Sequence, residues 1–125
     1  MPRPSRSEVE RFIGTSFRSV WAFELLGLLK RNRDKSLSHA EMVAGLRGSD
    51  LVVSQSVATL AAAGLILLQE DGSAIYAPAG AALDRLVEEA EALYVKSPDA
   101  VRRLIISAAN PAITAFANAF RLRGD

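Results

Sequence analysis

The sequence predicts a mainly α-helical fold that contains one small β-hairpin. Three observations lead to this prediction: apolar residues recur every three or four positions in several segments, capping residues separate those segments, and an Asp-Gly pair joins two short apolar runs. The chain has 125 residues, and half of them are hydrophobic. A chain of this size can bury a core of its own, so it needs neither disulfides nor a structural metal to fold.

The residue content limits the chemistry that the protein can perform. The chain has no cysteine and one histidine, which excludes thiolate nucleophiles, iron–sulfur clusters and cysteine-rich zinc sites. The glycine spacing fits no phosphate-binding loop, and no serine lies in a nucleophile-elbow motif. His39 and the carboxylates Glu88, Glu89 and Glu91 are expected to be solvated side chains. We therefore expect no enzymatic activity, no metal site and no cofactor.

The first long apolar pattern covers residues 16–31 and predicts the central helix of the core. Its apolar side chains follow helical spacing and are Phe17, Val20, Trp21, Leu25, Leu28 and Leu29. A shorter helix is expected before it, around residues 8–13. Trp21 is expected to pack in the core, with a place in the wall of an effector pocket as the alternative.

Two short helices with a tight turn between them are predicted from Ser38 onward. Ser38 and Glu41 have the spacing of a capping box, in which each side chain satisfies a free backbone N–H group. We expect Gly48 to end the first helix, and Ser49 or Asp50 to cap the second. The inward-facing residues of the two helices are Met42, Val43, Leu46, Val53, Val57 and Leu60. Two helices in this arrangement form a helix-turn-helix.

A β-hairpin is predicted directly after Gly64, where the second short helix ends. The two strand-like runs are residues 65–70 and 73–78, and Asp71-Gly72 joins them. This pair favours a type I′ turn, in which both central residues adopt positive φ. A helix-turn-helix that leads straight into a hairpin is the arrangement of a winged helix.

Three further helices are expected after the hairpin, and the first of them continues an apolar stripe. We divide the chain into a winged helix-turn-helix domain with its N-terminal helix, residues 1–78, and a C-terminal helical extension, residues 79–125. Ser97-Pro98 and Asn110-Pro111 each combine an N-cap residue with proline at the first helical position. The extension has more apolar surface than one compact domain can cover, which predicts a homodimer. The expected dimer interface consists of Leu83, Val87, Ala90, Tyr94, Leu104, Ile105, Ile113, Phe116 and Phe120.

Neither a membrane span nor a secretion signal is expected. Residues 104–120 are uncharged, but they are rich in alanine, contain Pro111 and fall short of the ~20 strongly apolar residues that a bilayer requires. Glu8 and Glu10 interrupt the chain soon after its basic start, so no apolar signal core follows. We therefore expect a cytoplasmic protein.

The stretch from Ser36 to Pro78 resembles the DNA-binding core of bacterial winged-helix regulators of the MarR and ArsR type. Its most specific element is Val57-x-x-Leu60-x-x-Ala63-Gly64-Leu65-Ile66, which is similar to the end of the recognition helix and the start of the wing in those regulators. The resemblance covers about a third of the chain and includes no catalytic or ligand-binding motif. It implies a dimeric transcription factor whose residues 51–63 enter the major groove of DNA.

Three groups of residues are candidate contacts to double-stranded DNA. The face of the second short helix opposite its core residues presents Leu51, Val52, Gln55, Ala58 and Thr59. The basic cluster that could bind phosphates consists of Lys30, Arg31, Arg33 and Lys35. Ser73 at the tip of the wing is the third candidate. Among these, Gln55 can pair with the major-groove edge of adenine.

The charge distribution keeps a second function open. Residues 1–35 carry 8 basic and 4 acidic side chains, residues 36–100 carry 3 and 9, and residues 101–125 carry 4 and 1. The outer face of the second short helix has no arginine or lysine, and the wing tip, residues 70–73, is acidic. The alternative hypothesis is a winged-helix module that binds a partner protein, instead of DNA, through this uncharged face.

Overall fold

The computed structural model describes residues 3–109 of the chain, and this part is mainly helical. The helices are α1 (Arg6–Ser16), α2 (Val20–Arg31), α3 (His39–Leu46), α4 (Asp50–Ala62), α5 (Ala81–Lys96) and α6 (Pro98–Ala109). The strands β1 (Ile66–Leu68) and β2 (Ala74–Tyr76) form a two-stranded antiparallel sheet in which Ile66 pairs with Tyr76 and Leu68 with Ala74. The predicted fold class, mainly α with a small β-hairpin, is confirmed at this level.

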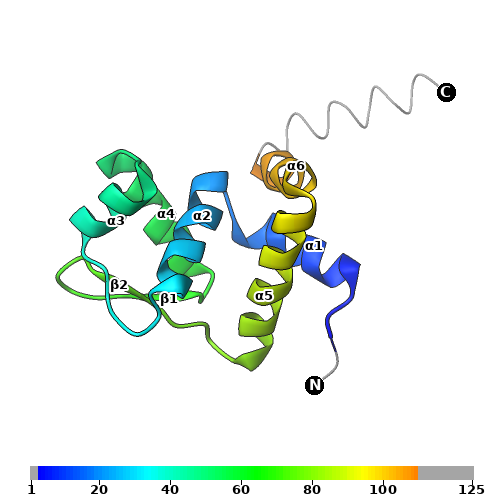
Figure 1. Ribbon diagram of the computed structural model, residues 1–125, viewed down its shortest axis with the longest axis horizontal. Helices are drawn as coiled ribbons and strands as arrows, with labels where there is room; N and C mark the ends of the chain where they lie inside the picture. The colour runs from blue at the N-terminus through cyan, green and yellow to red at the C-terminus, as the bar shows by residue number, and fades with distance from the viewer. Residues whose placement is uncertain (1–2, 110–125) are drawn as a thin grey trace.

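Helix α2 lies in the middle of the molecule, between two groups of elements (Figure 1). On one side it packs against α3, α4 and strand β2. On the other side α1, α5 and α6 pack against one another, and α6 also contacts α2. The buried side chains of both groups belong to one hydrophobic cluster. The N-terminal helix α1 thus packs with the C-terminal helices, and the boundary expected at residue 78 does not separate two cores.

The helix predicted for residues 16–31 begins later than expected, at Val20, so this boundary is corrected. Helix α1 ends at Ser16, and Phe17 is extended, with φ −117° and ψ 127°. The Ser19 side chain then accepts a hydrogen bond of 3.2 Å from the N–H group of Ala22 and caps the start of α2.

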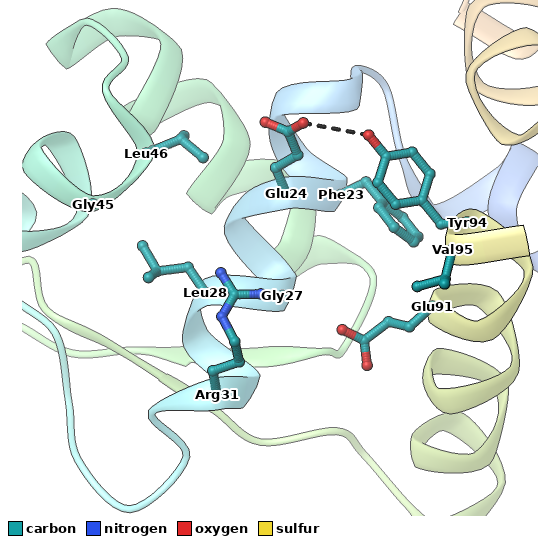
Figure 2. A pocket seen from close by; sticks show the side chains of 10 residues that line it. All are labelled: Phe23, Glu24, Gly27, Leu28, Arg31, Gly45, Leu46, Glu91, Tyr94 and Val95. Carbon is teal, nitrogen blue, oxygen red and sulfur yellow. Dashed lines mark hydrogen bonds between the residues drawn. The ribbon is translucent and has the colours of Figure 1, made fainter. Parts of the chain in front are cut away.

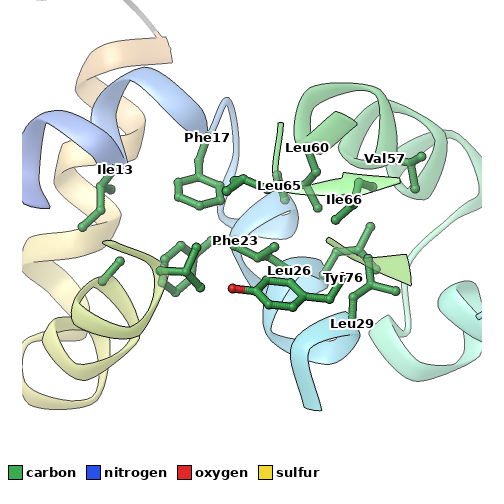
Figure 3. Packing of buried hydrophobic residues seen from close by; sticks show 14 of the residues in the cluster. Ile13, Phe17, Phe23, Leu26, Leu29, Val57, Leu60, Leu65, Ile66 and Tyr76 are labelled. Atoms are coloured by element: carbon green, nitrogen blue, oxygen red, sulfur yellow. The ribbon is translucent and has the colours of Figure 1, made fainter. Parts of the chain in front are cut away.

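Phe17 leaves the helical pattern because its side chain fills the core between α1 and α2. It is 1% exposed. Its ring packs edge to face against Phe12 and Phe23, with 5.7 and 5.0 Å between ring centroids. Figure 3 shows Phe17 and Phe23 in the same cluster as Leu60, Leu65 and Tyr76 from the other side of α2. The extended residue Phe17, between α1 and α2, therefore places its ring in the core that the two groups of elements share.

The two short helices have the predicted caps, with one correction at the turn. In the capping box of α3, Ser38 N–H donates to Glu41 Oε1 at 2.9 Å and Glu41 N–H donates to Ser38 Oγ at 3.1 Å. Ser49 caps α4. Helix α3 ends at the left-handed residue Arg47, with φ 58°, and not at Gly48. Glycine is the residue usually found in this conformation. For this reason the sequence predicted that the helix ends at Gly48, one residue after the observed Arg47.

Helix α4 turns the predicted face to the core. Val53, Val57 and Leu60 are buried, and Figure 3 shows Leu60 beside Leu65 and Val57 near Ile66. Gly64 has φ +75°, and the N–H group of Leu65 donates to the carbonyl of Leu60 at 3.1 Å. This is a glycine-based helix end that satisfies a free carbonyl of the last turn.

The hairpin has the predicted position but a different turn. Gly72 has φ +87°, whereas Asp71 does not adopt positive φ. Gly72 N–H donates to the Gln69 carbonyl at 3.0 Å, and Gln69 N–H donates to the Ser73 carbonyl at 2.8 Å. This is a three-residue loop with glycine in the left-handed position, so the prediction of a type I′ turn is wrong. The Asp71 carboxylate accepts the N–H group of Ser73, and this local bond favours the observed turn.

Two further contacts attach the hairpin to the rest of the molecule. Leu37, just before α3, exchanges two backbone hydrogen bonds of 2.9 Å with Ala74 in β2. The Tyr76 hydroxyl donates to Oδ1 of Asp84 in α5 at 2.6 Å. Burial, and next the bond to Asp84, raise the pKa of the Tyr76 hydroxyl, which keeps this donor protonated. Strand β2 is therefore held at its first residue, Ala74, and at its last residue, Tyr76.

Among the described residues, no single helix is both long and apolar enough to cross a membrane. Helices α1 and α2 meet the length and composition criteria only as a pair, with a bend of 106° between them. Most of the apolar side chains of α2 are buried in the core.

Replacement of Leu60 by alanine should destabilise the protein strongly. Leu60 is fully buried, and truncation of a buried leucine typically costs about 2–5 kcal/mol. Leu51→Ala, on the exposed face of the same helix, is the control and should change the free energy of unfolding by less than about 0.5 kcal/mol. Urea denaturation followed by circular dichroism measures both variants. Equal losses would mean that α4 is rotated from the orientation described.

Candidate nucleic-acid interface

The outer face of α4 is open and uncharged. Leu51 is 65% exposed, and Gln55 and Ala58 are exposed beside it. Val52 and Thr59 lie half-buried at the edges of this face. Beyond its first residue the helix carries no charged side chain. The structure thus brings the five residues predicted for this face to the side of α4 that points away from the core.

The two polar residues of this face differ in what they can offer a ligand. The Thr59 hydroxyl donates to the backbone carbonyl of Gln55 at 3.0 Å, so its donor is used inside the helix. The Gln55 side-chain amide makes no hydrogen bond within residues 3–109. Gln55 therefore has both a donor and an acceptor available to a ligand.

Residues at the start of α2 and just before it extend this face, and no pattern in the sequence indicated this. A shallow hollow of about 390 Å³ lies between the start of α2 and α4, and Arg18, Trp21, Val52 and Gln55 contribute to its lining. Both Trp21 and Val52 lie within 4 Å of the point where a Cβ atom on Gly48 would stand, so Trp21 sits beside the turn before α4. Arg18 is exposed and is the cation nearest to the uncharged face in this hollow.

Trp21 is a surface residue, which corrects its expected place in the core. It is 41% exposed. The buried residues of α2 are Ala22, Phe23, Leu25, Leu26, Gly27 and Leu29. Trp21 stands four residues before the buried Leu25, so helical spacing alone predicts burial for it as well. A single helix pattern did not show which neighbour would cover its side chain.

Lys30 is held by an ion pair and is removed from the candidate phosphate contacts. Its Nζ atom lies 2.7 Å from Oε1 of Glu91 in α5. The side chains are 15% and 30% exposed, so the pair is partly buried. The contact joins α2 to α5. It is expected to persist, because removal of one partner from a buried pair leaves an uncompensated charge. Glu91 was expected to be solvated, and this expectation is corrected as well.

The other basic residues of the predicted cluster lie away from the outer face of α4. Arg33 places its guanidinium 5.8 Å from the centre of the Tyr76 ring, and Arg31 and Lys35 are exposed. All three residues lie at or beyond the C-terminal end of α2, whereas the hollow beside α4 lies at the N-terminal end of α2. A helix of this length spans about 18 Å. The structure therefore does not bring this cluster together with the α4 face.

Ser73 is buried in the hairpin loop and is not available as a phosphate contact. It is 6% exposed. Its hydroxyl lies 2.6 Å from Oε1 of Gln69 and 2.5 Å from Oδ1 of Asp71. Hydrogen bonds from the Ser73 side chain and then from its backbone lower the pKa of Asp71. The hairpin tip thus keeps a negative charge, and its serine serves the turn.

His39 connects the first turns of the two short helices. Its Nε2 atom lies 2.9 Å from Oδ1 of Asp50, the first residue of α4. Hydrogen bonds from the backbone and then the side chain of Ser38 lower the pKa of Glu41 beside it. Both carboxylates lie in the first turn of a helix, where negative charge is favoured. These side chains stabilise the turns at the edge of the α4 face.

A second hollow, of about 370 Å³, lies between α2, α3 and α5 (Figure 2). Leu28 and Leu46 line its apolar side, and Glu24, Arg31 and Glu91 contribute charge. The Tyr94 hydroxyl lies 3.4 Å from Oε1 of Glu24 and links α5 with α2. Within residues 3–109 no group of three or more His, Cys, Asp or Glu side chains could hold a metal ion. Charges of both signs border this hollow, a composition that selects no particular ligand.

Part of the predicted dimer interface is buried inside the chain. Val87, Ala90 and Ile105 belong to the hydrophobic core, because α5 and α6 pack against α1 and each other. These three residues are therefore corrected from interface to core. Leu83, Tyr94 and Leu104 are half-buried. The remaining interface candidates, Ile113, Phe116 and Phe120, lie outside the described residues.

Comparison with known proteins gave no match. A scan against models of protein families, a search of curated proteins and a search of solved structures each found nothing similar to this chain.

Replacement of Ser73 by alanine should raise the pKa of Asp71 toward its ordinary value, because the hydroxyl bond to the carboxylate is lost. A carboxyl group whose pKa is lowered by folding stabilises the folded protein at pH values above the ordinary pKa of the group. This stabilisation is lost as the pH falls through the lower pKa of the folded state. NMR titration of the Asp71 carboxyl carbon in both proteins measures the shift. An unchanged titration curve would contradict the role of the Ser73 hydroxyl.

Proposed function

We propose that the protein is a DNA-binding transcriptional regulator of the winged-helix type, which acts in the bacterial cytoplasm as a dimer. The observation that carries this proposal is the free outer face of α4, which runs from Leu51 to Ala62 beside the turn of the helix-turn-helix. An α-helix presented in this way fits the major groove of B-DNA, which is about 12 Å wide.

The order of the elements supports the winged-helix assignment. Helices α2, α3 and α4 are followed directly by the β1–β2 hairpin. The pairing of Leu37 with Ala74 adds a short third segment to the hairpin, between α2 and α3. This arrangement places the hairpin next to the end of α4, where the wing of a winged helix lies. The resemblance of residues 36–78 to bacterial regulators agrees with it.

The charges around α4 favour binding with few phosphate contacts. Arg18 borders the hollow beside the outer face, and Arg47 lies exposed in the turn before α4. The face itself has no lysine or arginine, and the hairpin tip carries Glu70 and Asp71. Because each phosphate contact releases counterions, a small number of contacts gives a shallow dependence of affinity on salt.

Arg18→Ala should weaken DNA binding and make its salt dependence shallower. Loss of one phosphate contact lowers the slope of log affinity against log salt by about 0.9. The matched control is Arg31→Ala, at the far end of α2, which should leave the slope unchanged. Fluorescence anisotropy with a random-sequence duplex at several salt concentrations measures both. Equal slopes in the two variants and the unmodified protein would contradict the placement of Arg18 on DNA.

A second candidate function uses the same face to bind a protein. Leu51 and Trp21 are both large, apolar and exposed at this face, and exposed apolar groups of this kind often mark protein interfaces. A partner helix or groove with an apolar surface would bury them. If the full chain binds no duplex DNA at low salt and micromolar concentration, protein binding is the better explanation of this face.

The dimer is proposed on the C-terminal part of the chain. Leu104 lines a groove between α1 and α6, together with small residues that include Gly14 and Ala108. The chain continues beyond α6 with the apolar residues Ile113, Phe116 and Phe120.

Sedimentation equilibrium of the full chain at micromolar concentration should give twice the mass of one chain. The combined variant Ile113→Ser, Phe116→Ser and Phe120→Ser should lower this mass toward that of a monomer, because exposed apolar area drives association. A monomer in the unmodified chain would contradict the proposed dimer.

A further inference from the structure

We infer that the outer face of α4 selects A·T base pairs in the major groove, with Gln55 on adenine and with Leu51 and Ala58 against the methyl group of thymine. This inference rests on the proposed DNA-binding function and names the base pairs that the same face recognises. Its basis is the combination of one free amide with exposed apolar side chains and no charge.

The hydrogen-bonding groups on this face match adenine better than the other bases. Adenine presents one acceptor, N7, and one donor, the N6 amino group, and a glutamine amide can bond to both. The Gln55 amide is exposed and has no partner within the described residues, whereas Thr59 uses its hydroxyl within the helix. Gln55 is therefore the side chain that can read a base edge here.

The same face lacks the charged groups that usually recognise guanine and cytosine. Guanine presents two acceptors, which arginine or lysine usually binds, and α4 has neither residue. Cytosine presents an amino donor, which a carboxylate can accept. The carboxylate on α4 is that of Asp50, and its Oδ1 atom lies 2.9 Å from His39 Nε2 at the start of the helix. The charge pattern therefore disfavours G·C pairs.

The apolar residues of the face favour thymine. Thymine is the base that carries a methyl group in the major groove, and apolar side chains contact it. Leu51 is 65% exposed, and Ala58 is exposed two turns further along α4. Burial of such a side chain against a methyl group removes apolar surface of both from water.

The spacing of these side chains defines the length of the sequence that they can read. Leu51, Gln55 and Ala58 lie on successive turns of one helix face. At 1.5 Å per residue, the seven steps from Leu51 to Ala58 span about 10 Å. Base pairs stack at about 3.4 Å, so this distance corresponds to about three base pairs. The proposed recognition element in each half-site is a core of about three A·T pairs.

The test compares four duplexes of equal length, built from A·T, G·C, I·C or A·U pairs, as competitors for a fluorescent random duplex bound to the full chain at low salt. I·C pairs share the minor-groove pattern of A·T but present the acceptors of guanine in the major groove, and A·U pairs lack the thymine methyl group. We expect the A·T duplex to compete several-fold better than A·U, which lacks the methyl group, and more than about tenfold better than G·C and I·C, which lack both the methyl group and the adenine edge.

Two variants connect this preference with Gln55. Gln55→Ala should reduce the A·T preference about tenfold, the effect of a lost bidentate base contact, and leave the affinity for G·C unchanged. Ser54→Ala is the matched control, since Ser54 is an exposed polar neighbour on the same helix, and it should keep the preference. The melting temperature of each variant shows that the fold is retained.

Several outcomes would overturn the inference. Equal competition by A·T and G·C, or by A·T and I·C, would show that α4 does not read A·T pairs in the major groove, while the proposed DNA binding would stand. An A·T preference that Gln55→Ala leaves unchanged would assign the reading to other residues and also reject the inference. Absence of binding to every duplex would instead reject the DNA-binding function itself.

Discussion

The burial of α2 between two groups of elements is the constraint on which the rest of the structure depends. Ala22, Leu25, Leu26 and Leu29 are almost completely buried, and the helix contacts α3, α4, β2 and α6. Burial of apolar surface is the dominant favourable contribution to folding. Because α4 packs one face onto this central helix, Leu51, Gln55 and Ala58 on its opposite face stay exposed. The candidate interface is thus a direct consequence of how α2 is covered.

Polar contacts then fix how the two groups are placed around α2. The Lys30–Glu91 pair and the Tyr76–Asp84 hydrogen bond connect α5 with α2 and with the hairpin. Neither contact is fully exposed, and partly buried polar groups are costly when one partner is lost. They favour one arrangement of the helices over others with the same apolar burial. Side chains that seemed available for a ligand therefore serve the fold.

The outer face of α4 combines an exposed position with a neutral surface. Regulators that depend on many phosphate contacts bind tightly to any DNA and release it steeply with salt. A face built from Leu51, Gln55 and Ala58 would instead depend on base edges and methyl groups, with Arg18 and Arg47 as flanking cations. The same surface chemistry suits an apolar protein partner.

Local signals in the sequence were sufficient for the capping box at Ser38, the cap at Ser49 and the buried stripe of α4, because each depends on residues within a turn or two of one another. They also located the hairpin, although the Asp71 side chain selected another turn. Three features could not be predicted in this way. Phe17 is extended and lies outside the helix, Lys30 forms an ion pair with a carboxylate 61 residues away, and Trp21 lies beside α4. These features depend on contacts between distant parts of the chain, and no local pattern determines which distant residues meet in the folded protein.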